Sequence, residues 1–181
     1  MAHSQKANIY VVDNASEDDS VQFIQEKYPK VKVIVNTTNG GFAKGYNDGL
    51  KHVDADIFCL LNSDVEVTPN WLETVTEVFK TRPEAAIVQP KILDLKRPEY
   101  FEYAGAAGGF IDVMGYPFCR GRIFETIEKA DGKYLDQQKI FCASGSCLFI
   151  HRQTYLNLGG LDEKFFAHME EIDLCWRIWN S

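Results

Sequence analysis

The strongest constraint on the fold is an alternation of apolar and amphipathic segments in the first third of the chain. Three short apolar segments rich in β-branched residues are typical of buried strands: residues 7–14, 31–36 and 56–64. The segments between them predict helices at residues 16–28 and 39–53, and Ser16 is the predicted N-cap of the first. Strands separated by helices at this spacing predict an α/β fold with a parallel sheet and helices packed on it.

Two further helices and a strand are predicted later in the chain. Thr68 is a suitable cap for a helix whose apolar face begins at Trp71. Residues 85–93 predict another strand. The closing helix spans 168–180, with both of its tryptophans expected in the core and one apolar stripe formed by Met169, Ile172, Trp176 and Trp179.

The pattern changes between these elements. Residues 100–118 are rich in glycine and aromatic residues and predict an irregular β-hairpin. The polar residues 120–138 predict a mobile surface loop. Residues 139–152 predict a strand interrupted near Gly145, where a bulge or a close approach of an acceptor to the backbone are alternative explanations.

Composition limits the function classes. A chain of 181 residues suits one domain with a sizeable core. The net charge of −7 argues against a nucleic-acid partner, because phosphate backbones select basic surfaces. The apolar runs are too short for a membrane span, and the five cysteines contain no CxxC pair. An odd number of cysteines in apolar surroundings favours a reducing compartment, so we expect a cytoplasmic protein.

Two oxygen-bearing side chains follow the apolar run at residues 58–61. Asn62 and Asp64 point the same way if the strand continues, because side chains alternate along a strand. A carboxylate and an amide oxygen at this spacing can hold Mg²⁺ or Mn²⁺, and such ions keep positions open for substrate phosphates. The alternative is that Asp64 only caps the end of the strand.

Other polar candidates fall where ligands bind in open α/β sheets, at the carboxyl ends of parallel strands. They are Asp13, Asn39, Gly41, Lys44 and Asn47. Each has a simpler explanation: an ordinary acid at a strand end, a glycine-rich turn, or a lysine on a solvated helix face.

The order of the motifs resembles family 2 glycosyltransferases, most closely their bacterial rhamnosyltransferase-like members. The resemblance extends from about residue 8 to the end of the chain, and its strength lies in the ordered series. The series is "VVDNASEDDS", "NGGFAKGYNDGL", "LLNSDVEV", "SGSCLFIHR", "GGLDEKFF" and "MEEIDLCWR".

The resemblance implies a GT-A fold and inverting transfer of a sugar from a nucleotide-diphosphate donor. It implies that Asp13 contacts the nucleobase and that Asp64, in the motif Asn62-Ser63-Asp64, is the metal ligand. The remaining donor-site residues implied by it are Asn39, Gly41, Lys44, Asn47 and Asn62.

The closing helix resembles the family's motif for the general base. Glu170-Glu171 stands where Glu-Asp is usual, so Glu171 inherits the role of base and Glu170 is the alternative. Either carboxylate can take a proton from a hydroxyl within hydrogen-bond reach. By composition alone both acids suit an exposed helix face. Asp173 and Arg177, four residues apart, are expected to pair with each other.

The leading hypothesis is an inverting, metal-dependent glycosyltransferase of surface-polysaccharide synthesis, with a saccharide or lipid-linked acceptor at the inner face of the membrane. The alternatives are a catalytically silent nucleotide-sugar-binding module, an inactive fragment, and a nucleotidyltransferase, whose basic glycine-rich signature is not seen. Because family members begin with a further strand, we expect one domain over residues 1–181 that lacks this strand and is truncated at both ends. An exposed sheet edge then predicts either a homodimer that covers it or a rearranged sheet.

Overall fold

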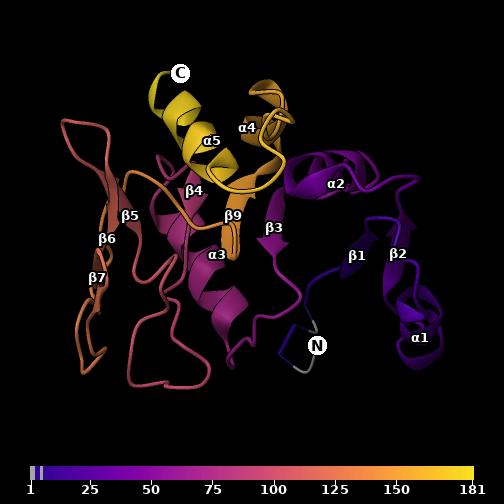
Figure 1. Cartoon of the computed structure of the whole chain (residues 1–181), viewed down its shortest axis with the longest axis horizontal. Coiled ribbons are helices and arrows are strands. Elements are labelled where there is room, and N and C mark those ends of the chain that lie inside the picture. Colours follow the sequence, from indigo (N-terminus) through magenta and orange to yellow (C-terminus); the bar gives the residue numbers. More distant parts are fainter. Residues whose placement is uncertain (1–2, 5) are drawn as a thin grey trace.

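A three-stranded sheet forms the centre of the molecule. In the computed structural model, which describes residues 3–4 and 6–181, its strands are β3 (Ile57–Leu61), β9 (Cys147–His151) and β4 (Ile87–Val88) (Figure 1). The order is β3-β9-β4, and β9 runs antiparallel to both neighbours. The register pairs Leu61 with Cys147 and therefore aligns the end of β3 with the start of β9.

A second, two-stranded parallel sheet is built from β1 (Tyr10–Asp13) and β2 (Lys32–Val35), which are joined through α1 (Ser20–Lys27). Figure 1 shows this part of the chain to the right of the central strands. The three strands predicted in the first third of the sequence are confirmed. Among the described residues β1 pairs with β2 and not with β3, so the expected sheet is divided in two.

The expectation of a mostly parallel sheet is wrong in one respect. Strands β3 and β4 do run in the same direction, but β9 lies between them and pairs with both in the antiparallel sense. In the described part of the chain, β1–β2 is therefore the one directly hydrogen-bonded parallel pair. The cause is the return of the chain through residues 139–146, which brings a late strand into the middle of the central sheet.

Helices cover both faces of the central sheet, because side chains alternate along each strand. On one face α2 (Gly41–Leu50), α4 (Arg152–Asn157) and α5 (Glu170–Trp179) enclose a core that contains Leu60, Leu148 and Leu174. On the other face α3 (Trp71–Thr81) packs Val75 and Phe79 against β9. No helix in the described residues is long and apolar enough to cross a membrane.

A four-stranded antiparallel sheet lies to the left in Figure 1. It contains β5 (Gly109–Ile111), β6 (Pro117–Cys119), β7 (Arg122–Ile123) and β8 (Thr126–Ile127). The predicted β-hairpin at 100–118 is confirmed by the β5–β6 pair. The prediction of a loop throughout 120–138 is wrong, since β7 and β8 form a second hairpin. Arg122 of this hairpin packs its guanidinium over the ring of Tyr103, 4.4 Å from the ring centre.

Two local expectations for helices are also wrong. Helix α1 begins at Ser20 rather than after Ser16, because the Asp13 carboxylate accepts the Ser16 N–H (3.0 Å) and holds the chain in a turn. On α5 the side chains of Trp176 and Trp179 are 53% and 47% exposed instead of buried, and the buried face is formed by Glu170, Leu174 and Cys175. The predicted pair of Asp173 with Arg177 is confirmed.

Candidate active site

The end of β3 and the start of β9 bring two predicted site regions together. Beyond the paired ends of these strands, the Asn62 N–H donates to the Ser146 carbonyl oxygen (3.0 Å). Residues 62–64 therefore lie beside the turn formed by residues 144–146. Asp64 is exposed at this edge, and its carboxylate makes no hydrogen bond or ion pair with the side chains and backbone that the structure describes.

The turn at residues 144–146 is held in a fixed position. The Ser144 N–H donates to Gln89 Oε1 (2.7 Å), and the Ser146 N–H donates to Ser144 Oγ (3.2 Å). Gly145 lies at its centre, where a Cβ would be 3.3 Å from the Phe42 ring and 4.0 Å from the carboxyl carbon of Glu171. A larger side chain would occupy the space between this turn and Glu171.

Glu171 lies in the first turn of α5 and faces Gly145. Burial raises the pKa of this carboxyl above its ordinary value, and the neighbouring negative charge of Glu170 adds to the effect. A carboxylate with a raised pKa is a stronger base and suits proton abstraction from a hydroxyl. The residues before the helix, His168 and Met169, both have a φ of 73°, so the chain turns sharply into α5.

Glu170 occupies a different environment. Its side chain is 4% exposed, and Oε2 has no hydrogen-bond partner in the described part of the chain. A carboxyl enclosed in the protein is less accessible to an acceptor hydroxyl than one that borders the turn at 144–146. The geometry thus favours Glu171 over Glu170 as the predicted base.

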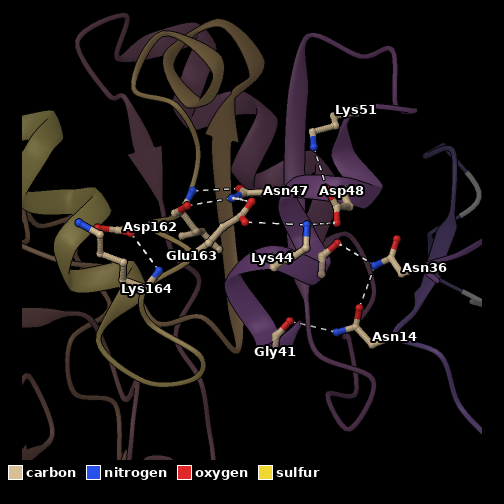
Figure 2. Close-up of polar contacts among 12 residues, drawn as sticks. Asn14, Asn36, Gly41, Lys44, Asn47, Asp48, Lys51, Asp162, Glu163 and Lys164 are labelled. Atoms are coloured by element: carbon tan, nitrogen blue, oxygen red, sulfur yellow. Dashed lines mark hydrogen bonds and ion pairs between the residues drawn. The ribbon is translucent and has the colours of Figure 1, made fainter. Parts of the chain in front are cut away.

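Asp13 and its neighbours form a connected polar group at the end of β1. Asp13 is 8% exposed, and its carboxylate is engaged by the Ser16 N–H. Figure 2 shows that Asn14 donates to the Gly41 carbonyl oxygen (3.1 Å) and accepts a hydrogen bond from Asn36 (2.8 Å). Sequence reasoning missed Asn14 and Asn36 as members of this group, although each directly ends a predicted strand.

The predicted donor-site residues on α2 have many protein partners. The Lys44 ammonium lies 2.7 Å from Asp48 and 3.8 Å from Glu163, and the Asp48 contact raises the pKa of Lys44 (Figure 2). Asn47 donates to the Leu161 carbonyl oxygen (2.8 Å) and accepts from both the Tyr155 hydroxyl (2.6 Å) and the Leu161 N–H (3.0 Å).

Asn39 and Gly41 define the start of the same helix. The Asn39 side-chain oxygen accepts the Gly41 N–H (3.0 Å), and Gly41 has a φ of 85°, in the left-handed region that favours glycine. Their predicted contacts with a donor remain predictions, as do those of Lys44 and Asn47.

Two oxygen-bearing side chains that could bind a divalent ion, Asn62 and Asp64, follow the end of β3. Within the described residues there is no group of three or more His, Cys, Asp and Glu side chains that could hold a metal. The unengaged Asp64 carboxylate and the Asn62 amide can supply part of a coordination shell. Mg²⁺ and Mn²⁺ sites of this kind are completed by water and by substrate phosphates, so the residues fit an ion that binds together with a diphosphate.

Comparison with known families identifies the type of domain. The family model described as "Glycosyl transferase family 2" matches residues 2–159. The chain belongs to this family. An N-acetylglucosaminyl-diphospho-decaprenol L-rhamnosyltransferase of Mycobacterium tuberculosis is 26% identical over 192 residues, which cover 96% of this chain and 61% of the relative. The chain thus spans less than two thirds of the length of this relative.

Solved glycosyltransferases share the fold. The structure of GalNAc-T7 with UDP, GalNAc and Mn²⁺ has a TM-score of 0.67 at 19% identity, covering 96% of this chain and 34% of the other. The mannosyltransferase PcManGT from Pyrobaculum calidifontis, in complex with GDP-Man and Mn²⁺, has a TM-score of 0.61 at 15% identity, with coverage of 94% and 42%. The predicted GT-A fold and family are confirmed.

Proposed function

We propose that the protein is an inverting glycosyltransferase that moves a sugar from a nucleotide-diphosphate donor to a saccharide or lipid-linked acceptor in surface-polysaccharide synthesis. Membership of glycosyl transferase family 2 supports sugar transfer. The observation that carries the proposal is the arrangement around residues 144–146. The Ser146 carbonyl oxygen in this turn accepts the Asn62 N–H, and Gly145 faces Glu171, which supports a proposed metal site at residues 62–64 and a proposed base at Glu171 next to one turn.

Asp64 and Asn62 would hold Mg²⁺ or Mn²⁺ together with the donor diphosphate. The exposed Asp64 carboxylate is available for this role because it has no protein partner among the described residues. When bound, the ion neutralises charge on the departing diphosphate. Asp13, at the end of β1, would contact the nucleobase, and the first turn of α2 would border the donor through Asn39 and Gly41.

Glu171 would act on the acceptor. Its carboxylate takes the proton of the acceptor hydroxyl while that oxygen forms a bond to the anomeric carbon. The bond between the anomeric carbon and the diphosphate oxygen breaks, and its electron pair leaves with the nucleoside diphosphate. Attack from the face opposite the leaving group inverts the anomeric configuration. Burial raises the pKa of Glu171 and thereby matches the base to this proton transfer.

One relative supports the proposed acceptor, and the proposed location depends on that acceptor. The name of the Mycobacterium tuberculosis relative describes an acceptor linked to decaprenol through a diphosphate. A similar lipid-linked acceptor would bring this protein to the inner face of a membrane from the cytoplasm. A second copy of the chain covering an open sheet edge is part of the same proposal.

The test is donor binding and turnover measured side by side. A thermal-shift panel of UDP-, GDP- and dTDP-sugars, with and without Mn²⁺, should show stabilisation by one nucleotide class only when the ion is present. Release of the matching nucleoside diphosphate in the presence of acceptor would support transfer. Stabilisation without release would instead identify a silent nucleotide-sugar-binding module, and the absence of both would reject the proposal.

A further inference from the structure

The second half of α5 presents an exposed aromatic group. Trp179 stacks on Phe141 with the ring planes 3° apart and the centroids 6.3 Å apart, and its indole N–H donates to the Phe141 carbonyl oxygen (2.9 Å). Trp176 meets the same Phe141 ring edge-on at 5.8 Å. Both indoles remain about half exposed. Large exposed aromatic side chains are informative because burial would normally stabilise the fold.

Trp179, but not Trp176, lines a groove of about 980 Å³. The residues that line the groove come from α3, from β4 and its flanking residues, from residues 134–141 and from the end of α5. Its volume is at the upper end of the range of about 300–1,000 Å³ for small-molecule sites. It therefore has room for a ligand larger than a single ring.

The groove is connected to the proposed base through α5. Glu171, Cys175 and Trp179 are spaced four residues apart, so they follow one face of the helix. Trp179 lies about 12 Å beyond Glu171 along the axis. Residues 139–145 run beside the same face: Gly145 borders Glu171, the Ala143 N–H contacts Cys175 Sγ (3.5 Å), and Lys139 lies over Trp179 (4.3 Å).

The side chains around the groove suit a saccharide. Sugar rings have one apolar face of C–H groups, which packs on an indole, and hydroxyl groups that bond to amides and carboxylates. Such polar groups also line the groove: Gln137, Gln138 and Asp136, of which the Asp136 carboxylate pairs with Arg120 through Oδ1 (3.0 Å). Lys139 covers the indole only through an exposed cation–π contact, which is weak and readily exchanged for a ligand.

A peptide strand is a poorer fit for the same groove. The edge it would pair with is β4, which has two residues and is followed by Gln89, whose side chain is already bonded to Ser144 and Gly105, and by Pro90, which has no N–H to donate. The polar amides that line the groove also disfavour a purely apolar chain such as a lipid tail.

We infer that this groove binds the saccharide portion of the acceptor, with a sugar ring stacked on Trp179 and its hydroxyls bonded by Gln137, Gln138 and Asp136. The inference rests on the proposed function, since it places the acceptor whose hydroxyl reaches Glu171. The separation along α5 means that the ring on Trp179 is not the one that reacts. The groove thus selects acceptors that already contain more than one sugar.

Matched tryptophan variants test the inference. The disaccharides chitobiose, cellobiose and mannobiose serve as probes, with binding measured by saturation-transfer NMR on the full chain. We expect at least one to bind the native protein at millimolar concentration, and W179A to weaken that binding at least tenfold. W176A should bind as the native protein does, because Trp176 has similar exposure and the same Phe141 contact but lies outside the groove.

A further variant separates stacking from structure. W179F loses the bond to the Phe141 carbonyl oxygen but keeps an aromatic face, so it should retain most of the binding. Equal losses in W176A and W179A, a loss in W179F as large as in W179A, or no binding by any probe would overturn the inference. Metal-dependent stabilisation by nucleotide-sugars, measured on the same samples, reports on the proposed function independently, so the two failures are distinguishable.

Discussion

Two groups of polar side chains lie on neighbouring parts of the molecule and differ in their protein partners. On α2, Lys44 and Asn47 are held by ion pairs and hydrogen bonds to Asp48 and to residues 155–163. At the edge formed by β3, β9 and α5, Asp64 has no partner among the described residues and Glu171 is partly buried with a raised pKa. The residues predicted for one site thus fall into two groups. One group is bonded to the protein and supports the fold, and the other is free to bind a ligand.

The number of protein partners separates supporting residues from residues that can bind a ligand. An amide whose hydrogen-bonding capacity is used by the protein fixes the backbone, whereas an acid without partners is able to bind an ion or accept a proton. We therefore expect substitutions in the two groups to have different consequences. Changes at the edge should reduce turnover or metal binding, and changes on α2 should reduce stability.

The largest effect is expected for E171Q. Loss of the base should lower turnover by about 10²-fold or more while donor binding changes little. Steady-state rates together with donor affinity check this. E170Q is the matched control, since the substitution is the same and the residue is adjacent but enclosed. A comparable loss of turnover in E170Q alone would transfer the role of base to Glu170.

For D64A we expect loss of the Mn²⁺-dependent part of donor binding. The carboxylate has no protein partner in the described residues, so its removal should leave the fold intact. Calorimetric titration of nucleoside diphosphate with and without Mn²⁺ measures the effect, and thermal unfolding of the apoprotein verifies the fold. Unchanged Mn²⁺-dependent affinity would exclude Asp64 as a ligand.

For N47A we expect destabilisation by about 1–3 kcal/mol, the usual cost of leaving partly buried polar groups without a partner. The groups affected are the Tyr155 hydroxyl and both backbone groups of Leu161. Urea unfolding measures the free energy. A variant as stable as the native protein that has lost donor binding would contradict the supporting role and assign Asn47 to the donor site.

The smallest expected effect is a shift in pH dependence. The pKa of Glu171 is raised from 4.5 by burial, and the base is active when deprotonated, so turnover should fall with decreasing pH at a value above that of an ordinary glutamate. The sign for stability is opposite: the folded state favours the protonated acid, so stability falls as pH rises through the raised pKa. E171Q should lose this pH dependence of the melting temperature.

Strands and their order of appearance were predictable because burial leaves a clear apolar pattern. The predictions of strand length and strand direction that were wrong depend on contacts between residues distant in sequence. The strand predicted at 85–93 shortens to Ile87–Val88, because Gln89 turns its side chain to Ser144 and Gly105. The antiparallel position of β9 likewise follows from the return of the chain rather than from any local signal.

For the site, residue types were predictable but their surroundings were not. Nothing in "MEEIDLCWR" distinguishes an enclosed Glu170 from a partly open Glu171, since the distinction arises from the neighbouring turn at Gly145. The periodicity of the closing helix also fits a buried Trp179 as well as an exposed one. Which helix face is covered is determined by residues 139–145.

Helix α2 has a mechanical consequence. Gly49 lets it lie directly against Val12 of β1, the Tyr46 hydroxyl donates to the Leu61 carbonyl oxygen (3.1 Å), and Phe42 borders Gly145. A helix of ten residues is a stiff rod about 15 Å long. We therefore expect a tilt of the β1–β2 sheet to move α2 as a unit and to shift the turn at residues 144–146, so that a ligand bound at the proposed nucleobase contact, Asp13, would change the position of Gly145 relative to Glu171.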